Sequence, residues 1–158
     1  MTRHRIALHL GRLAAGLLGA AILSLAVLSN MAARPTNLGA TNGHLAECPA
    51  TPNCVSSQTE REDRRMPPWA FSGDPQAAFE RLRQAVEAVP RTHVVSASGG
   101  YLHVECTSAF FRFVDDVEFL VDPSQSVIHF RSASRVGRSD FGVNRRRMKA
   151  LHKEFETE

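Results

Sequence analysis

The sequence predicts an α+β fold: a four-stranded antiparallel sheet flanked by two amphipathic helices and preceded by an N-terminal hydrophobic helix. Residues 13–28 form a nearly continuous apolar run. Residues 95–130 alternate apolar and polar side chains, as strands do, and residues 74–89 and 148–155 repeat apolar residues at helical spacing. Strands with one apolar face need a cover, which the two later helices would provide.

The composition limits the size of the domain and the class of partner. The chain has 158 residues, 43% of them hydrophobic and 22% charged, which is enough for one domain with a sizeable core. Its formal charge of +3 depends on four arginines that precede the first acidic residue, Glu47: Arg3, Arg5, Arg12 and Arg34. Without them the acidic residues outnumber the basic ones by one, so we expect no nucleic-acid partner.

Residues 1–33 are expected to be a signal anchor or a signal peptide. Arginines and histidines precede the apolar run, whose only polar residue is Ser24. A helix of this length covers about 24 Å, a little less than the ~30 Å hydrocarbon layer. Small residues at Ser24 and Ala26 would permit cleavage and secretion. Because the apolar run continues beyond them, we expect a single-pass anchor in the cytoplasmic membrane, with the domain on the periplasmic or extracellular side.

Residues 34–73 are predicted to be a linker followed by an irregular strap, because they hold five of the eight prolines. The domain core is expected over residues 74–158. Asp74 and Pro75 provide an N-cap and a first-turn proline for a helix that stops at Pro90. A C-terminal helix would bury one stripe that consists of Met148, Leu151 and Phe155.

Two hairpins are predicted between these helices. Gly99-Gly100 is typical of a two-residue turn, and Asp122-Pro123 begins a second turn. The apolar positions that should face the core alternate on both sides of these turns: Val95, Ala97, Leu102, Val104, Cys106, Phe110, Phe113, Val117, Phe119, Val121, Ile128 and Phe130. Together the hairpins make a four-stranded meander.

The three cysteines are expected to have different roles. Cys48 and Cys54 lie six residues apart, which permits a disulfide in an oxidising compartment. Cys106 falls on the apolar side of its strand and is expected to be a small buried residue. An alternative role for Cys54 is that of a nucleophile.

Two histidines are candidate metal ligands. His103 and His129 could share the polar face of the sheet with Asp116 or Glu118. They lack the close spacing of a metal motif, so we expect surface histidines, no metal site and no cofactor.

Charge is segregated along the second half of the chain. Five acidic residues lie between positions 105 and 122, and eight basic residues lie between positions 131 and 153. The turn at Pro123 would place Arg131 opposite either Asp116 or Glu118 on the non-core face. Such arginines can form a structural ion-pair network or hold an anionic ligand, and the sequence leaves both open.

Three stretches resemble domain-of-unknown-function family 1499: PNCVSS at 52–57, RFVDDVEF at 112–119 and IHFRSASRVGRSDFGVNRRR at 128–147. The resemblance covers about residues 45–155 and implies a compact domain after a signal or membrane segment. It implies no established activity. The matching residues are Cys54, Asp115, Asp116, Glu118, Arg131, Ser132, Ser134, Arg135, Gly137, Ser139, Asp140, Gly142, Asn144 and Arg145.

Two functions are consistent with these residues. The first is a non-enzymatic binding or accessory module at the outer face of the membrane, for which an anionic lipid head group or a cell-wall fragment is the expected ligand. Its expected contacts are Arg131, Arg135, Arg145, Asp116, Glu118, Ser132 and Ser134. The alternative is a hydrolase or transferase that uses Asp115, Asp116 and Glu118 with Cys54.

Overall fold

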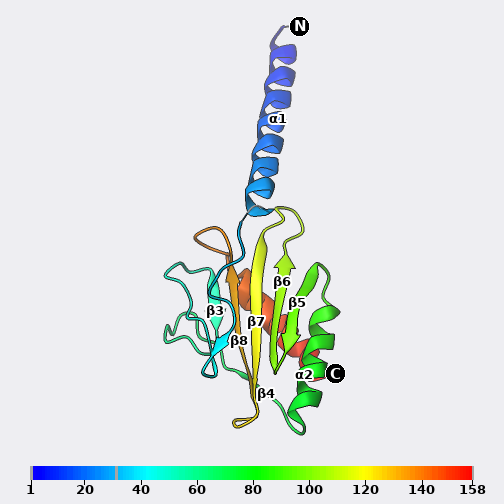
Figure 1. Ribbon diagram of the computed structural model, residues 1–158. Helices are drawn as coiled ribbons and strands as arrows, with labels where there is room; N and C mark the ends of the chain where they lie inside the picture. Colours follow the sequence, from blue (N-terminus) through cyan, green and yellow to red (C-terminus); the bar gives the residue numbers. More distant parts are fainter. Residues whose placement is uncertain (1, 31, 158) are drawn as a thin grey trace.

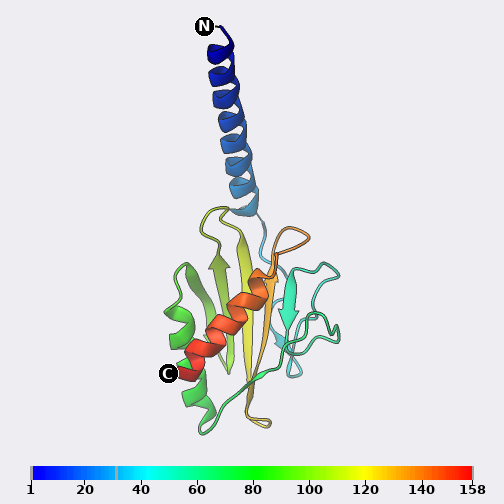
Figure 2. The same cartoon turned by 180° about the vertical axis from the view of Figure 1, so that it is seen from behind.

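The computed structural model describes residues 2–30 and 32–157. A long helix, α1, projects from one end of a sheet that carries two further helices on one face (Figures 1 and 2). The elements in chain order are α1 (Thr2–Asn30), β1 (Ala40–Thr41), β2 (His44–Leu45), β3 (Cys54–Ser56), β4 (Trp69–Ala70), α2 (Pro75–Glu87), β5 (Thr92–Ser98), β6 (Tyr101–Thr107), β7 (Val114–Asp122), β8 (Val127–Ser134) and α3 (Val143–Thr157).

Strands β5 to β8 form the two antiparallel hairpins that the alternation predicts. Gly99 and Gly100 connect the first pair with φ angles of 60° and 77°, the left-handed conformations that a tight two-residue turn requires. In the second pair Glu118 lies opposite Arg131, one of the two registers expected from the sequence. The central meander therefore follows from local sequence signals.

The main sheet has six strands, so the prediction of four is wrong. Its order is β3-β8-β7-β6-β5, and β4 also pairs with β8. The two additional strands come from the proline-rich segment and have only three and two residues, too few to show an alternation. They form because β8 would otherwise expose an unpaired edge, and this edge is available only in the folded chain.

The predicted strand positions of Phe110 and Phe113 are also wrong. Both residues lie in the loop over residues 108–113, between β6 and β7. The side chain of Phe110 is 87% exposed. The loop is closed by its own hydrogen bond, in which the Phe113 N–H donates to Ser108 Oγ at 2.9 Å.

Helices α2 and α3 cover the apolar face of the sheet (Figure 2). Asp74 caps α2 by accepting a hydrogen bond from the Ala77 N–H at 2.8 Å, as the Asp-Pro pair predicts. Trp69, from β4, is buried against the rings of Phe119, Phe130 and Phe155. The proline-rich segment thus supplies a central residue of the core.

The opposite face is crossed by the segment that follows α1 (Figure 1). Residues 34–39 contact β6 and β7 through Arg34 and Gly39, and β1 pairs with β2 beyond them. Both faces of the central strands are therefore covered, which explains why the polar side chains of β7 are as buried as its apolar ones.

Helix α1 contains an apolar stretch over Ala7–Ser24 with a mean hydropathy of 1.5, and none of this stretch is buried. Within the described residues it is the one helix long and apolar enough to cross a membrane, and a signal sequence would have the same properties. The whole helix of 29 residues would extend about 43 Å. The predicted N-terminal hydrophobic helix is confirmed.

Candidate functional site

The antiparallel register divides the predicted site residues between the two faces of the sheet. Side chains of successive strand residues point to opposite faces. Glu118, Arg131 and Asp116 therefore face the segment that follows α1, whereas Ser132 and Ser134 face α3. The sequence predicts that these residues belong to one ligand-binding site, but the fold places them on opposite faces of the sheet.

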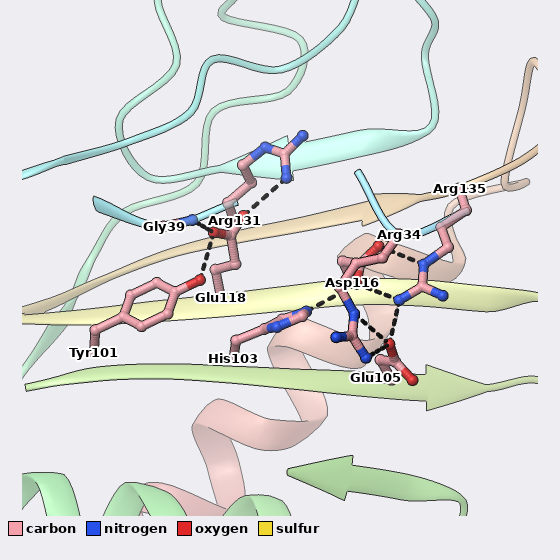
Figure 3. Close-up of polar contacts among 9 residues, drawn as sticks. All are labelled: Arg34, Gly39, Tyr101, His103, Glu105, Asp116, Glu118, Arg131 and Arg135. Atoms are coloured by element: carbon pink, nitrogen blue, oxygen red, sulfur yellow. Dashed lines mark hydrogen bonds and ion pairs between the residues drawn. The ribbon is translucent and has the colours of Figure 1, made fainter. Parts of the chain in front are cut away.

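The face of the sheet that contacts the segment after α1 is called the polar face below, and it carries two groups of charged residues. Glu118 is the centre of the first group (Figure 3). Its Oε2 atom accepts a hydrogen bond from Arg131 Nη1 at 2.9 Å. Its Oε1 atom accepts one from the Tyr101 hydroxyl at 2.8 Å and one from the Gly39 N–H at 2.7 Å. The pKa of Tyr101 is raised, first by burial and then by the neighbouring Glu118 carboxylate. Glu118 thus links β6, β8 and the segment after α1.

Asp116 and Glu105 form the second group, around Arg135. Arg135 donates from Nε and Nη2 to the two carboxylate oxygens of Asp116, each at 2.8 Å, and Nη2 also contacts Glu105. His103 Nε2 lies 2.8 Å from Asp116 Oδ1. Arg34 donates to Glu105 from Nε at 3.0 Å and from Nη2 at 2.7 Å (Figure 3).

These contacts shift the pKa values of the carboxyl groups. Burial opposes ionisation of Asp116, but hydrogen bonds from Arg135 and His103 outweigh it and lower the pKa. Burial likewise opposes ionisation of Glu105, and hydrogen bonds from Arg135 and Arg34 outweigh it. The pKa of Arg135 is raised chiefly by its hydrogen bonds to Asp116. Asp116, Glu105 and Arg135 are therefore charged at neutral pH.

A third group lies under α3 on the other face. Arg147 donates to Asp115 Oδ2 at 2.5 Å and to Asn144 Oδ1 at 2.6 Å. Asn144 is fully buried; its Oδ1 atom accepts from the Ser132 hydroxyl at 2.6 Å, and its Nδ2 atom donates to Ser134 Oγ at 3.1 Å. Ser132 and Ser134 therefore anchor α3 to β8.

Arg145 belongs to neither face. Its guanidinium donates to the backbone carbonyl of Asp63 at 2.8 Å and to that of Arg65 at 3.4 Å. The seven predicted contact residues thus occupy three places: the polar face, the α3 interface and this surface loop.

Several residues of these groups were not expected from the sequence. Tyr101 alternates with His103 and Glu105 on β6, so the same two-residue period that places His103 on the charged face could also have placed Tyr101 there. Asn144 and Arg147 are three residues apart on α3, so they share a side of the helix. No local signal identifies the contacts of Arg34 and Gly39, because each joins positions more than 70 residues apart.

A pocket of about 430 Å³ opens at one end of the sheet, between the 108–113 loop and the loop over residues 135–142. Its apolar lining consists of Phe111, Phe113, Val136, Phe141 and Val143. The volume lies within the range of about 300–1,000 Å³ that is usual for small-molecule sites.

The family model of a protein of unknown function, DUF1499, matches residues 44–155, which include every strand from β2 onward and nearly all of α3. The chain belongs to the DUF1499 family. No curated protein and no solved structure matches it.

The cysteines of this DUF1499 domain have the positions that the sequence predicts. Cys48 and Cys54 form a disulfide. Cys106 is buried on the core face, and burial raises the pKa of its thiol. A disulfide sulfur is not a thiolate nucleophile, so the pairing removes Cys54 from the alternative catalytic set.

The histidines have separate partners within the DUF1499 domain. His103 is buried beside Asp116, which corrects its expected surface position, whereas His129 Nδ1 lies 3.2 Å from the Ser57 hydroxyl. The pKa of His129 is lowered, chiefly by burial. The described part of the chain contains no group of three His, Cys, Asp or Glu residues placed to hold a metal ion.

Proposed function

We propose that this protein is a non-enzymatic binding module that α1 tethers to the outer face of the cytoplasmic membrane. The observation that carries the proposal is the path of the chain after α1. Arg34 binds Glu105 and Gly39 binds Glu118, so the domain is fixed to the segment that leaves the helix. The positive residues before the apolar run favour retention of that end in the cytoplasm.

The tether is short. Four residue steps separate the end of α1 at Asn30 from Arg34, and an extended chain covers about 14 Å over that distance. A domain on a long, flexible linker would sample a wide volume above the bilayer. This domain would instead remain next to the membrane with one end of its sheet directed towards it.

The ion pairs of the polar face favour a structural role for Arg131 and Arg135. Both guanidinium groups are bound by carboxylates, and their side chains are 5% and 8% exposed. Because both side chains are almost fully buried, an anionic head group or cell-wall fragment could reach them only if the residues that cover them moved aside. We therefore assign the polar face to holding the tether and place ligand contact elsewhere in the domain.

The geometry gives less support to the hydrolase or transferase alternative. Cys54 is in a disulfide. Asp115 points towards α3, away from Asp116 and Glu118, and is bound by Arg147. The proposed carboxylates therefore lie on two faces, which is unfavourable for their joint action on one bond.

A topology experiment tests the tether. Alkaline phosphatase fused after Glu158 should be active, because this reporter folds only after export. Deletion of residues 7–24 should keep the fusion in the cytoplasm and abolish its activity. The intact mass of membrane-extracted protein should include residues 1–26, as an uncleaved anchor requires. Activity of the deleted fusion, or a mature protein that is recovered in the soluble fraction, would contradict the proposal.

A further inference from the structure

Exposed apolar side chains are concentrated at one end of the sheet. Among the described residues outside α1, the large hydrophobic side chains that are exposed all belong to the 108–113 and 135–142 loops or to the residue that follows them: Phe110, Phe111, Phe141 and Val143. Phe110 and Phe141 are each 87% exposed. A cluster of this kind on a soluble surface marks an interaction site.

The backbone holds one of these rings outward. Phe141 has a φ angle of 52°, in the left-handed region that bulky residues rarely occupy. The turn is fixed by its neighbours, since the Phe141 N–H donates to Ser139 Oγ and the Gly142 N–H donates to Asp140 Oδ1. A strained conformation that exposes an aromatic ring to water has no evident stabilising effect on the isolated domain.

The pocket between the loops offers a ligand mainly apolar contacts. Of its polar lining residues, Asp115 is bound by Arg147, and Asp140 accepts hydrogen bonds from the Gly142 and Asn144 N–H groups. Ser108 accepts the Phe113 N–H. Because these groups are already engaged by the protein, the walls favour a hydrocarbon ligand over a charged one.

The same end of the sheet adjoins α1. In both views the two loops lie at the end from which the helix projects (Figures 1 and 2). Arg34 reaches Glu105 near the end of β6, and the 108–113 loop begins just after this strand. A bilayer that contained α1 would therefore lie beside Phe110 and Phe141.

We infer that the 108–113 and 135–142 loops enter the lipid interface and that the pocket between them takes one acyl chain of a phospholipid from the bilayer that holds α1. The inference rests on the proposed tether and adds the ligand class. Exposed rings would transfer from water to the interface, and the hydrocarbon source would be adjacent to the pocket.

Photocrosslinking of the full-length protein in phospholipid nanodiscs tests this inference. The probe is phosphatidylcholine with a diazirine on one acyl chain, and adducts are located by mass spectrometry. We expect adducts on Phe111, Phe113 and α1, and none on the turn between β7 and β8 at the opposite end of the sheet. Val136→Trp should fill the pocket and remove most adducts from Phe113.

Two further variants control for misfolding and for the added ring. Val143→Trp fills the pocket from the α3 side and should have the same effect if Val136→Trp impairs folding. Ala150→Trp places the same ring at an exposed position of α3 and should leave the adducts unchanged.

The adduct pattern separates failure of the inference from failure of the tether. Adducts on α1 without any on the two loops would overturn the acyl-chain site, as expected if a protein partner covers the loops, and would leave the tether in place. Adducts on Phe113 that persist in both tryptophan variants would overturn occupancy of the pocket. Absence of adducts from α1 as well would contradict the tether itself.

Discussion

Replacement of Arg131 tests the structural role of the polar face. The Arg131 and Glu118 side chains are 5% and 0% exposed, and Nη1 and Oε2 lie 2.9 Å apart. Arg131→Met would leave Glu118 with the Gly39 N–H and the Tyr101 hydroxyl but without a cation. Removal of one partner from a buried pair costs about 3–5 kcal/mol. That loss is a large part of the 5–15 kcal/mol by which domains are usually stable.

A double variant distinguishes two effects of Arg131→Met: the Glu118 carboxylate that is left without a cation, and the packing that is lost with the arginine side chain. Glu118→Gln combined with Arg131→Met removes both charges, while the amide oxygen can still accept from Gly39 and Tyr101. Because replacement of a whole buried pair is often nearly neutral, we expect the double variant to lose less than about 2 kcal/mol. It should therefore be more stable than Arg131→Met alone.

Chemical denaturation of the full-length protein in detergent measures these differences. The single tryptophan, Trp69, is buried between the sheet and α3 and reports unfolding of the core. Arg83→Met is the matched control, because Arg83 pairs with Glu80 and Glu87 on the exposed side of α2, and its denaturation midpoint should stay unchanged. Equal midpoints for Arg131→Met and Arg83→Met would refute the structural role.

Three other outcomes are expected. The lowered pKa values of Glu105 and Asp116 make the folded protein lose stability as pH falls below their ordinary values of 4.5 and 3.8, and Arg135→Met should weaken this dependence in acid-unfolding curves. Arg135→Ala should lower the denaturation midpoint more than Arg145→Ala, which removes only exposed contacts with backbone carbonyls; the reverse order would contradict the assigned contacts. Thiol labelling of unreduced, denatured protein should modify Cys106 alone, and modification of all three cysteines would exclude the disulfide.

The sequence predicts those parts of the fold that local patterns specify. The Gly99-Gly100 turn, the Asp74 cap and the pairing of Arg131 with Asp116 or Glu118 depend on residues within one hairpin or one helical turn. The structure contains the turn, the cap and the Glu118 alternative of the pairing. By contrast, β3 and β4 depend on the free edge of β8, far away in the sequence. Short strands of this kind have no pattern of their own.

The candidate site is less predictable for the same reason. The distribution of charged residues limits the partner of Arg131 to Asp116 or Glu118, because the length of the turn allows two registers, and the structure has the Glu118 register. It does not separate Ser132 from Arg131, although adjacent strand residues must face opposite sides of a sheet. The contacts of Arg34 and Gly39 arise only once the segment after α1 crosses the folded sheet.

The buried charges of the polar face are a costly way to cover a sheet, since apolar residues of similar volume would often stabilise it as well. An apolar strap, however, could slide along an apolar face, because hydrophobic contact has no direction. The hydrogen bonds of Glu118 and Glu105 require Gly39 and Arg34 at defined positions. In the proposed function, this requirement fixes the path of the chain between the bilayer and the sheet. It thereby also sets which loops face the lipid.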